Sequence, residues 1–101
     1  MEIKKNVNNG VLSVSVSGRI DTATAPSLEN ELKDSVGDCE SLVLDFSEVN
    51  YISSAGLRVL LLSHKAMSRK GGLKLKNVTE PIMEILEVTG FTDILDIEKG
   101  K

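Results

Sequence analysis

Aromatic residues are scarce in this chain. Its 101 residues include two phenylalanines, one tyrosine and no tryptophan. The core must therefore be aliphatic, built from leucine, isoleucine and valine. A deep pocket that stacks a nucleotide base or a flavin is not expected, and we predict no cofactor.

Cysteine and histidine each occur once, as Cys39 and His64. A lone cysteine forms no internal disulfide, and neither residue has a neighbour at metal-ligand spacing, so no metal is expected. By helical spacing, His64 falls on the same face as Leu57 and Leu60, which indicates a packed side chain rather than a catalytic base. The unpaired thiol fits a reducing, cytoplasmic location.

Long apolar runs are also missing, because none approaches the roughly 20 residues that span a bilayer. The first residues are polar and charged and do not resemble a signal peptide. The formal net charge is −3, and the densest basic stretch, residues 65–76, contains no aromatic residue. We therefore expect neither a membrane nor a nucleic acid as partner. The length predicts one domain, residues 1–101.

Strand and helix patterns alternate along the chain. Alternating apolar and polar residues, or short apolar runs, predict strands at residues 2–6, 11–17, 41–46, 73–78 and 91–97. Helical spacing predicts helices from Pro26 to Gly37, from about Ala55 to Lys70, and between Thr79 and Gly90.

This order of elements predicts an α/β fold, with a mixed sheet of about four or five strands and helices packed largely on one face. Asn8-Asn9-Gly10 predicts a hairpin turn between the first two strands. Gly18 is expected to end the second strand. Residues 41–46 are apolar on both faces, which favours a central strand covered on both sides.

The most informative segment is the run Ser53-Ser54-Ala55-Gly56. It places two hydroxyls where a helix begins, with no bulky neighbour to shield them. Such a position can bind an anion or accept a phosphate covalently. The alternative is that one serine simply caps the helix.

Nucleophilic catalysis by these serines is not favoured. Their flanks do not form a Gly-x-Ser-x-Gly elbow, and no glycine-rich phosphate loop is present. His64 lies about ten residues along the same helix, or about 15 Å, which is too far for a base. Asp21 and Asp45 stand at predicted strand ends and could approach the serines, but two carboxylates without a pocket do not indicate an enzyme.

Three segments, Gly18–Asp21, Leu42–Val49 and Tyr51–Leu57, together resemble the STAS domain, the family shared by sulphate transporters and anti-sigma factor antagonists. The resemblance covers nearly the whole chain and implies a STAS-like fold. A freestanding chain of this length is similar to the bacterial anti-sigma factor antagonists.

The resemblance implies a non-enzymatic partner switch. In its unphosphorylated form the domain would bind an anti-sigma factor, a GHKL-type serine kinase, and free a sigma factor. Phosphorylation at Ser54 would release the partner, and a serine phosphatase would restore it. Relatives commonly have aspartate at the position of Ser53. This chain therefore carries a second hydroxyl beside Ser54, and Ser53 is the alternative acceptor. The chain is expected to be a monomer or weak dimer.

The partner surface implied by the resemblance combines the residues after the second predicted strand with the start of the predicted helix that follows Ser54. Its residues are Asp21, Thr22, Thr24, Ser53, Ser54, Ala55, Gly56 and Arg58.

Other interpretations remain open. Asp21 can simply end a strand, and Thr22 and Thr24 can be helix caps. The wide apolar face after Ser54, which includes Val59 and Leu62, can be core or a partner groove. The alternative functions are a STAS scaffold that is never phosphorylated and a regulatory module that binds a small ligand or anion.

Overall fold

Strands and helices alternate in the computed structural model, which describes residues 1–100. The strands are β1 (Glu2–Asn8), β2 (Val11–Ile20), β3 (Ser41–Ile52), β4 (Leu73–Val78) and β5 (Asp96–Lys99). The helices are α1 (Ala25–Val36), α2 (Ser54–Met67), α3 (Glu80–Val88) and the short 3-10 helix η1 (Phe91–Asp93).

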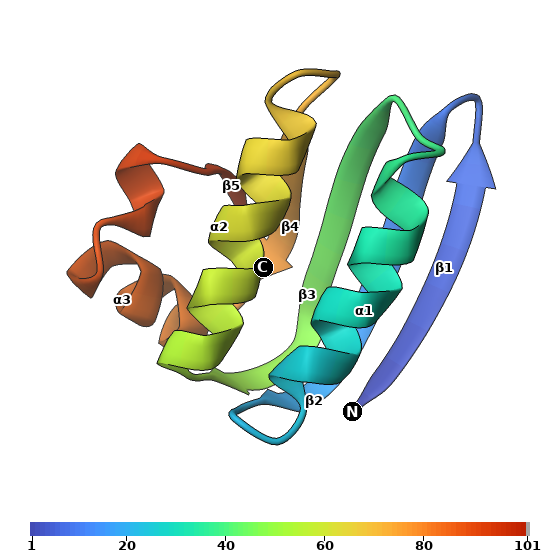
Figure 1. Cartoon of the computed structure of the whole chain (residues 1–101). Coiled ribbons are helices and arrows are strands. Elements are labelled where there is room, and N and C mark those ends of the chain that lie inside the picture. The colour runs from blue at the N-terminus through green and yellow to red at the C-terminus, as the bar shows by residue number, and fades with distance from the viewer. Residues whose placement is uncertain (101) are drawn as a thin grey trace.

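The strands form one five-stranded sheet in the order β1-β2-β3-β4-β5 (Figure 1). β1 pairs antiparallel with β2, whereas the other three pairs are parallel. Asn9 and Gly10 make the hairpin turn, with φ of 54° and 82°, because both residue types tolerate positive φ. The predicted α/β fold with a mixed sheet is thus confirmed.

One face of the sheet is covered by helices. α1 and α2 lie side by side over it (Figure 1), and Ile82 and Leu86 of α3 join the same buried core. Along β2, the valines at 14 and 16 are buried in this core, whereas the side chain of Ser15 between them is exposed. The period of two therefore separates an apolar face from a polar one.

The prediction that the central strand is covered on both faces is wrong. Leu42, Leu44 and Phe46 are fully buried, but Asp45 points to the opposite face and is only half-buried. That face is polar because Asp45 lies in register with Ser15 of β2 and with a lysine of β4. No helix among the described residues covers it, so one apolar face suffices for this sheet.

Three strands are longer than predicted, and the first of them, β1, ends at Asn8 rather than at residue 6. β2 continues past Gly18, which has a φ of +93° and lies where the register with β3 shifts. A bulge there uses the conformational freedom of glycine without ending the strand. β3 continues to Ile52 rather than ending at Phe46, because Val49 and Ile52 are buried and pair alongside β2.

Two helical regions also differ from prediction. α2 ends at Met67 rather than Lys70. Residues 91–97 are not one strand, because the left-handed Gly90 (φ 81°) leads into η1, where the N–H of Ile94 donates to the carbonyl of Phe91 at 3.1 Å. β5 therefore begins only at Asp96.

Candidate functional site at the start of helix α2

The ends of β2 and β3 bring the candidate residues together. These strands are parallel neighbours and end in register at Ile20 and Ile52. The segments that follow them therefore lie at the same edge of the sheet. The N–H of Ser53 donates to the carbonyl oxygen of Ile20 at 2.8 Å, which fixes the start of α2 against the end of β2.

The two serines have different structural roles. Ser53 is the N-cap of α2, and its Oγ accepts a hydrogen bond from the N–H of Gly56 at 3.4 Å. Its side chain is half-buried. Ser54 is the first helical residue, is exposed, and its hydroxyl makes no hydrogen bond within residues 1–100. The capping alternative therefore applies to Ser53, and the hydroxyl of Ser54 remains available.

Small side chains after the serines allow close packing of the helix on the sheet. A Cβ placed on Gly56 would lie 2.6 Å from Cγ2 of Ile20 and 2.7 Å from Cγ1 of Ile52. Gly56 is buried, and Ala55 is half-buried. Gly56 thus faces the interior, and it shapes the candidate surface by setting how closely α2 approaches the strands.

Asp21 organises the loop between β2 and α1. Its Oδ1 accepts hydrogen bonds from the N–H groups of Ala23 and Thr24, both at 3.0 Å. These bonds, with the backbone N–H of Thr24 contributing most, hold the pKa of Asp21 below its ordinary value despite partial desolvation. Thr22 lies in the same loop and is exposed.

Thr24 stands at the N-cap position of α1, but its hydroxyl does not cap that helix. It instead donates to the carbonyl of Arg19 at 2.7 Å and accepts from the N–H of Asp21 at 2.8 Å. The expectation of a threonine cap is therefore wrong in this detail, because the loop turns the hydroxyl back toward the end of β2.

A contact beside this loop was not predicted from the sequence. Arg19 lies over the ring of Tyr51, with Cζ 4.3 Å from the ring centroid, and its Nε is 3.6 Å from Oδ2 of Asp21. Arg19 and Tyr51 are each the second-to-last residue of their strands, and they are in register. Arg19 stands one residue before Ile20 and Tyr51 one residue before Ile52, and this equal spacing is the signal that could have revealed the pair.

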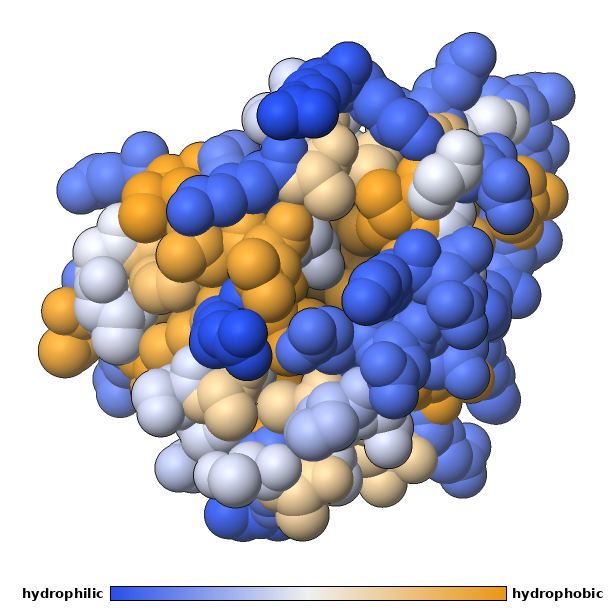
Figure 2. All heavy atoms as spheres, viewed as in Figure 1, coloured by the Kyte–Doolittle hydropathy of each residue, from blue (hydrophilic) through white to orange (hydrophobic). Residues whose placement is uncertain are grey.

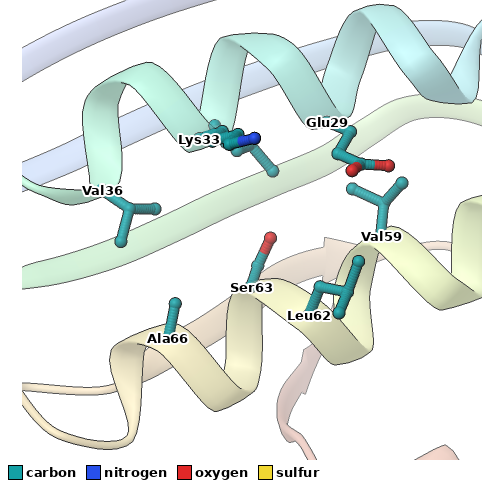
Figure 3. Close-up of a pocket in the computed structure, with 8 residues that line it drawn as sticks. Glu29, Lys33, Val36, Val59, Leu62, Ser63 and Ala66 are labelled. Atoms are coloured by element: carbon teal, nitrogen blue, oxygen red, sulfur yellow. The ribbon is translucent and has the colours of Figure 1, made fainter.

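Arg58 reaches from α2 toward α1. Its Nη1 is 3.9 Å from Oε1 of Glu29, and the side chains are 71% and 38% exposed. Beyond this pair, an apolar groove with a volume of about 240 Å³ runs between the two helices (Figure 3). Val59 is buried at its floor, whereas Leu62 is 40% exposed at its rim. The wide apolar face of α2 is thus partly core and partly groove.

The groove continues a larger apolar area on this side of the molecule. Figure 2 shows apolar side chains gathered over α2 and α3, and hydrophilic side chains over α1 and β1. The exposed apolar residues include Leu62, Val88 and Ile94. Helix α2, which begins at Ser54, therefore carries part of this apolar surface.

Asp45 and His64 do not join the serines. Asp45 lies within β3 on the open face, where its Oδ1 accepts from the N–H of Ser47 at 2.9 Å. Partial burial would raise the pKa of Asp45, but hydrogen bonds from Ser47 and Asn77 and the charge of Lys76 together outweigh it, so the pKa lies below its ordinary value. His64 is half-buried in the last turn of α2. The suggestion that Asp45 approaches the serines is wrong, because β3 extends beyond it.

Within residues 1–100, no cluster of histidine, cysteine or acidic side chains has the arrangement of a metal site. In the same range, no helix combines the length and apolar character needed to cross a bilayer.

The fold and this surface define a small α/β domain that presents a helix N-terminus, a free hydroxyl and an adjoining apolar groove on one side. Comparison with known families agrees with this architecture. The model of the STAS domain matches residues 2–100, and the chain belongs to the STAS domain family.

Two relatives are similar over nearly the whole chain. The anti-sigma-B factor antagonist of Bacillus subtilis is 33% identical over 98 residues, which cover 96% of this chain and 88% of that protein. The crystal structure of an anti-sigma factor antagonist from Mycobacterium paratuberculosis superimposes with a TM-score of 0.88 at 29% identity, covering 96% of this chain and 84% of that one.

The fold alone is shared with a more distant protein. SpoIIAA of Bacillus in its phosphorylated form superimposes with a TM-score of 0.73 at 12% identity, covering 95% of this chain and 90% of that one.

Proposed function

We propose that this chain is an anti-sigma factor antagonist that is switched by phosphorylation of Ser54. In the unphosphorylated state it binds an anti-sigma factor that is also a serine kinase, and a sigma factor is thereby freed. The observation that carries the proposal is the exposed Ser54 hydroxyl, unbonded within residues 1–100, at the first position of α2. The names of the relatives supply the class of partner.

Ser54 is a better acceptor than Ser53. The Ser53 hydroxyl is half-buried and caps α2 through Gly56, so transfer of a phosphate to it would disrupt the helix start. Serine and aspartate are equally good N-caps. Replacement of the usual aspartate by Ser53 therefore preserves the cap and leaves the next hydroxyl free.

A phosphate on Ser54 would be tolerated by the fold and rejected by an interface. It adds about −1.5 to −2 charge at neutral pH, which the positive end of the α2 dipole accommodates. The phosphorylated SpoIIAA structure supports this, since the same fold exists with a phosphorylated chain. In a close interface, the charge must be desolvated, and a loss of about 3 kcal/mol would weaken binding more than a hundredfold.

The same proposal covers the protein's other properties. The chain is one STAS domain that regulates transcription through protein contacts and has no catalytic activity of its own. It acts in the cytoplasm as a monomer or weak dimer, and a serine phosphatase removes the phosphate. Asp21, Thr22, Thr24 and Arg58 contribute to the partner surface around the start of α2.

Phosphorylation in vitro tests the proposal. The protein is incubated with ATP and each candidate anti-sigma factor kinase from the same genome, and the modified residue is mapped by mass spectrometry. We expect one phosphate on Ser54, none on Ser54→Ala, and an unchanged yield on Ser53→Thr, which keeps the cap. Absence of both modification and binding with every candidate kinase would refute the switch.

The presence of Ser53 in place of the usual aspartate favours one second candidate, a STAS scaffold that binds its partner without being phosphorylated. Partner affinity distinguishes the two functions. Equal affinity of Ser54→Ala and Ser54→Asp for the partner would support the scaffold, whereas selective loss in Ser54→Asp supports the switch.

A further inference from the structure

Arg58 occupies the position on α2 from which a side chain can reach residue 54. It lies four residues after Ser54 in the same helix, and residues at this spacing are neighbours on the helix surface, with Cβ atoms about 5–6 Å apart. Both side chains are exposed. A group added to the Ser54 hydroxyl would therefore lie within reach of the guanidinium.

The present contact of Arg58 is weak and easily exchanged. Its ion pair within residues 1–100 is with Glu29 of α1, at 3.9 Å between Nη1 and Oε1, and both side chains are solvent-accessible. Exposed ion pairs at this separation add little to stability, because water and salt screen the charges and both side chains lose freedom. A stronger acceptor near Ser54 can therefore displace the carboxylate of Glu29.

We propose that Arg58 is the internal receptor for the phosphate of phosphorylated Ser54 and that it leaves Glu29 to bind it. This inference rests on the proposed modification of Ser54 and states which side chain of the same protein binds the phosphate. No bond is made or broken in the exchange, because the guanidinium moves from a carboxylate to a phosphate.

Geometry and charge both favour the phosphate over Glu29. An acidic group four residues N-terminal to a basic one is the favourable orientation on a helix. The planar guanidinium donates two parallel hydrogen bonds to a phosphate, and a phosphoserine carries about twice the charge of a carboxylate. Arg58 therefore exchanges one long ion pair with a carboxylate for a bidentate contact with a more highly charged phosphate.

The other charged groups at this edge of the fold do not replace Arg58. Arg19 is already paired with Asp21 at 3.6 Å and stacked on Tyr51. The carboxylate of Asp21 would repel a phosphate placed near it. Lys33 stands on α1 one turn beyond Glu29, toward the far end of the groove (Figure 3).

The exchange has a consequence for the groove between α1 and α2. Glu29 lines this groove and points across it toward Val59 (Figure 3). When Arg58 moves to the phosphate, Glu29 loses its partner on α2, and Lys33, one turn along α1, is the cation that still lines the groove with it. The α2 side of the groove therefore becomes less positive, so the change extends beyond the modified residue.

The test uses full-length protein with phosphoserine inserted at position 54 during translation, so no kinase is needed. The second pKa of the phosphate is measured by phosphorus NMR in the wild type, in Arg58→Gln and in Lys33→Gln. Lys33→Gln removes the same charge from the neighbouring helix and is the matched control. Heteronuclear NMR spectra of each variant confirm that it is folded.

A nearby cation favours the doubly charged phosphate and lowers its pKa. We therefore expect Arg58→Gln to raise the phosphate pKa by about 0.2–0.4 unit, as expected for one helical ion pair, and Lys33→Gln to change it much less. We also expect Glu29→Gln to lower the phosphate pKa slightly, because the competing carboxylate is gone, and high salt to reduce the effect of Arg58→Gln.

Equal phosphate pKa values in Arg58→Gln and Lys33→Gln would overturn the inference. So would an Arg58 Nε–H resonance that is the same with and without the phosphate. These outcomes are independent of the proposed function. If no kinase modifies Ser54 in the separate assay, the switch fails, while the behaviour of an installed phosphate still decides the role of Arg58.

Discussion

Gly56 of α2 packs directly against Ile20 of β2, so closely that a Cβ on residue 56 would lie 2.6 Å from the Ile20 Cγ2. The carbonyl of the same isoleucine accepts the N–H of Ser53 at 2.8 Å. Ile20 at the end of β2 therefore contacts α2 twice, through its side chain at Gly56 and through its carbonyl at Ser53, and with Ile52 it sets how closely this helix approaches the sheet. The position of the free hydroxyl follows from this contact.

Gly56→Ala should destabilise the protein. The added methyl must displace the isoleucines at 20 and 52, and overpacking of this kind costs about 1–3 kcal/mol, which exceeds the gain in helix propensity. Gly37→Ala is the matched control, because nothing lies within 4 Å of its Cβ position. Urea unfolding should show a lower midpoint for Gly56→Ala, and equal midpoints for the two variants would contradict the packing described.

Ser53 and Ser54 should differ when each is replaced by alanine. Ser53→Ala removes the cap on Gly56 N–H, and we expect a loss of about 0.5–1 kcal/mol in the free energy of unfolding. Ser54→Ala removes no hydrogen bond within residues 1–100 and should leave stability nearly unchanged. Thermal unfolding of both variants, with Ser53→Asp as a cap-preserving control, measures the difference; an equal loss in both would reverse the assignment of the cap.

Lys70 should stabilise the C-terminal end of α1. Its Nζ donates to the carbonyl oxygens of Val36 at 2.7 Å and Cys39 at 2.9 Å, and also contacts that of Gly37. Lys70→Gln loses these charge-assisted bonds at a helix C-terminus, and we expect a loss of about 1–2 kcal/mol. Lys4→Gln, an exposed residue of β1, controls for charge. Denaturant unfolding that does not separate the two variants would rule out the cap.

The loop around Asp21 should weaken in acid. Because the folded pKa of Asp21 lies below its ordinary value of 3.8, the ionised carboxylate stabilises the folded state above that value, and the contribution is lost as the pH falls through the lower, folded pKa. We expect Asp21→Asn to be less stable than the wild type at pH 7 and to differ from it less below about pH 4.

Urea unfolding at several pH values tests this dependence. Asp34→Asn, on the exposed surface of α1, controls for the loss of one negative charge. A stability difference between the wild type and Asp21→Asn that is constant from pH 7 to pH 3 would contradict the role of the Asp21 hydrogen bonds.

Much of the fold is readable from local patterns. The alternation in β2 and β4, the turn at Asn9-Gly10 and the helix ends at Gly37 and Gly90 depend on residues close together in the chain. The extension of β3 through residues 47–52 was not readable in this way. Its polar residues face solvent and only Val49 and Ile52 reach the core, so pairing with β2 maintains the strand where its own pattern is weak.

The sequence by itself determined the α/β order of elements and the serine pair at the start of a helix, because these features are local. Only the tertiary structure distinguished the two hydroxyls, because it places Ser53 against Ile20, a residue more than thirty positions away, and leaves Ser54 exposed. It also decided that Gly56 faces the core and that Arg58 meets Glu29. Such contacts join separate elements, and spacing along one chain segment cannot encode them.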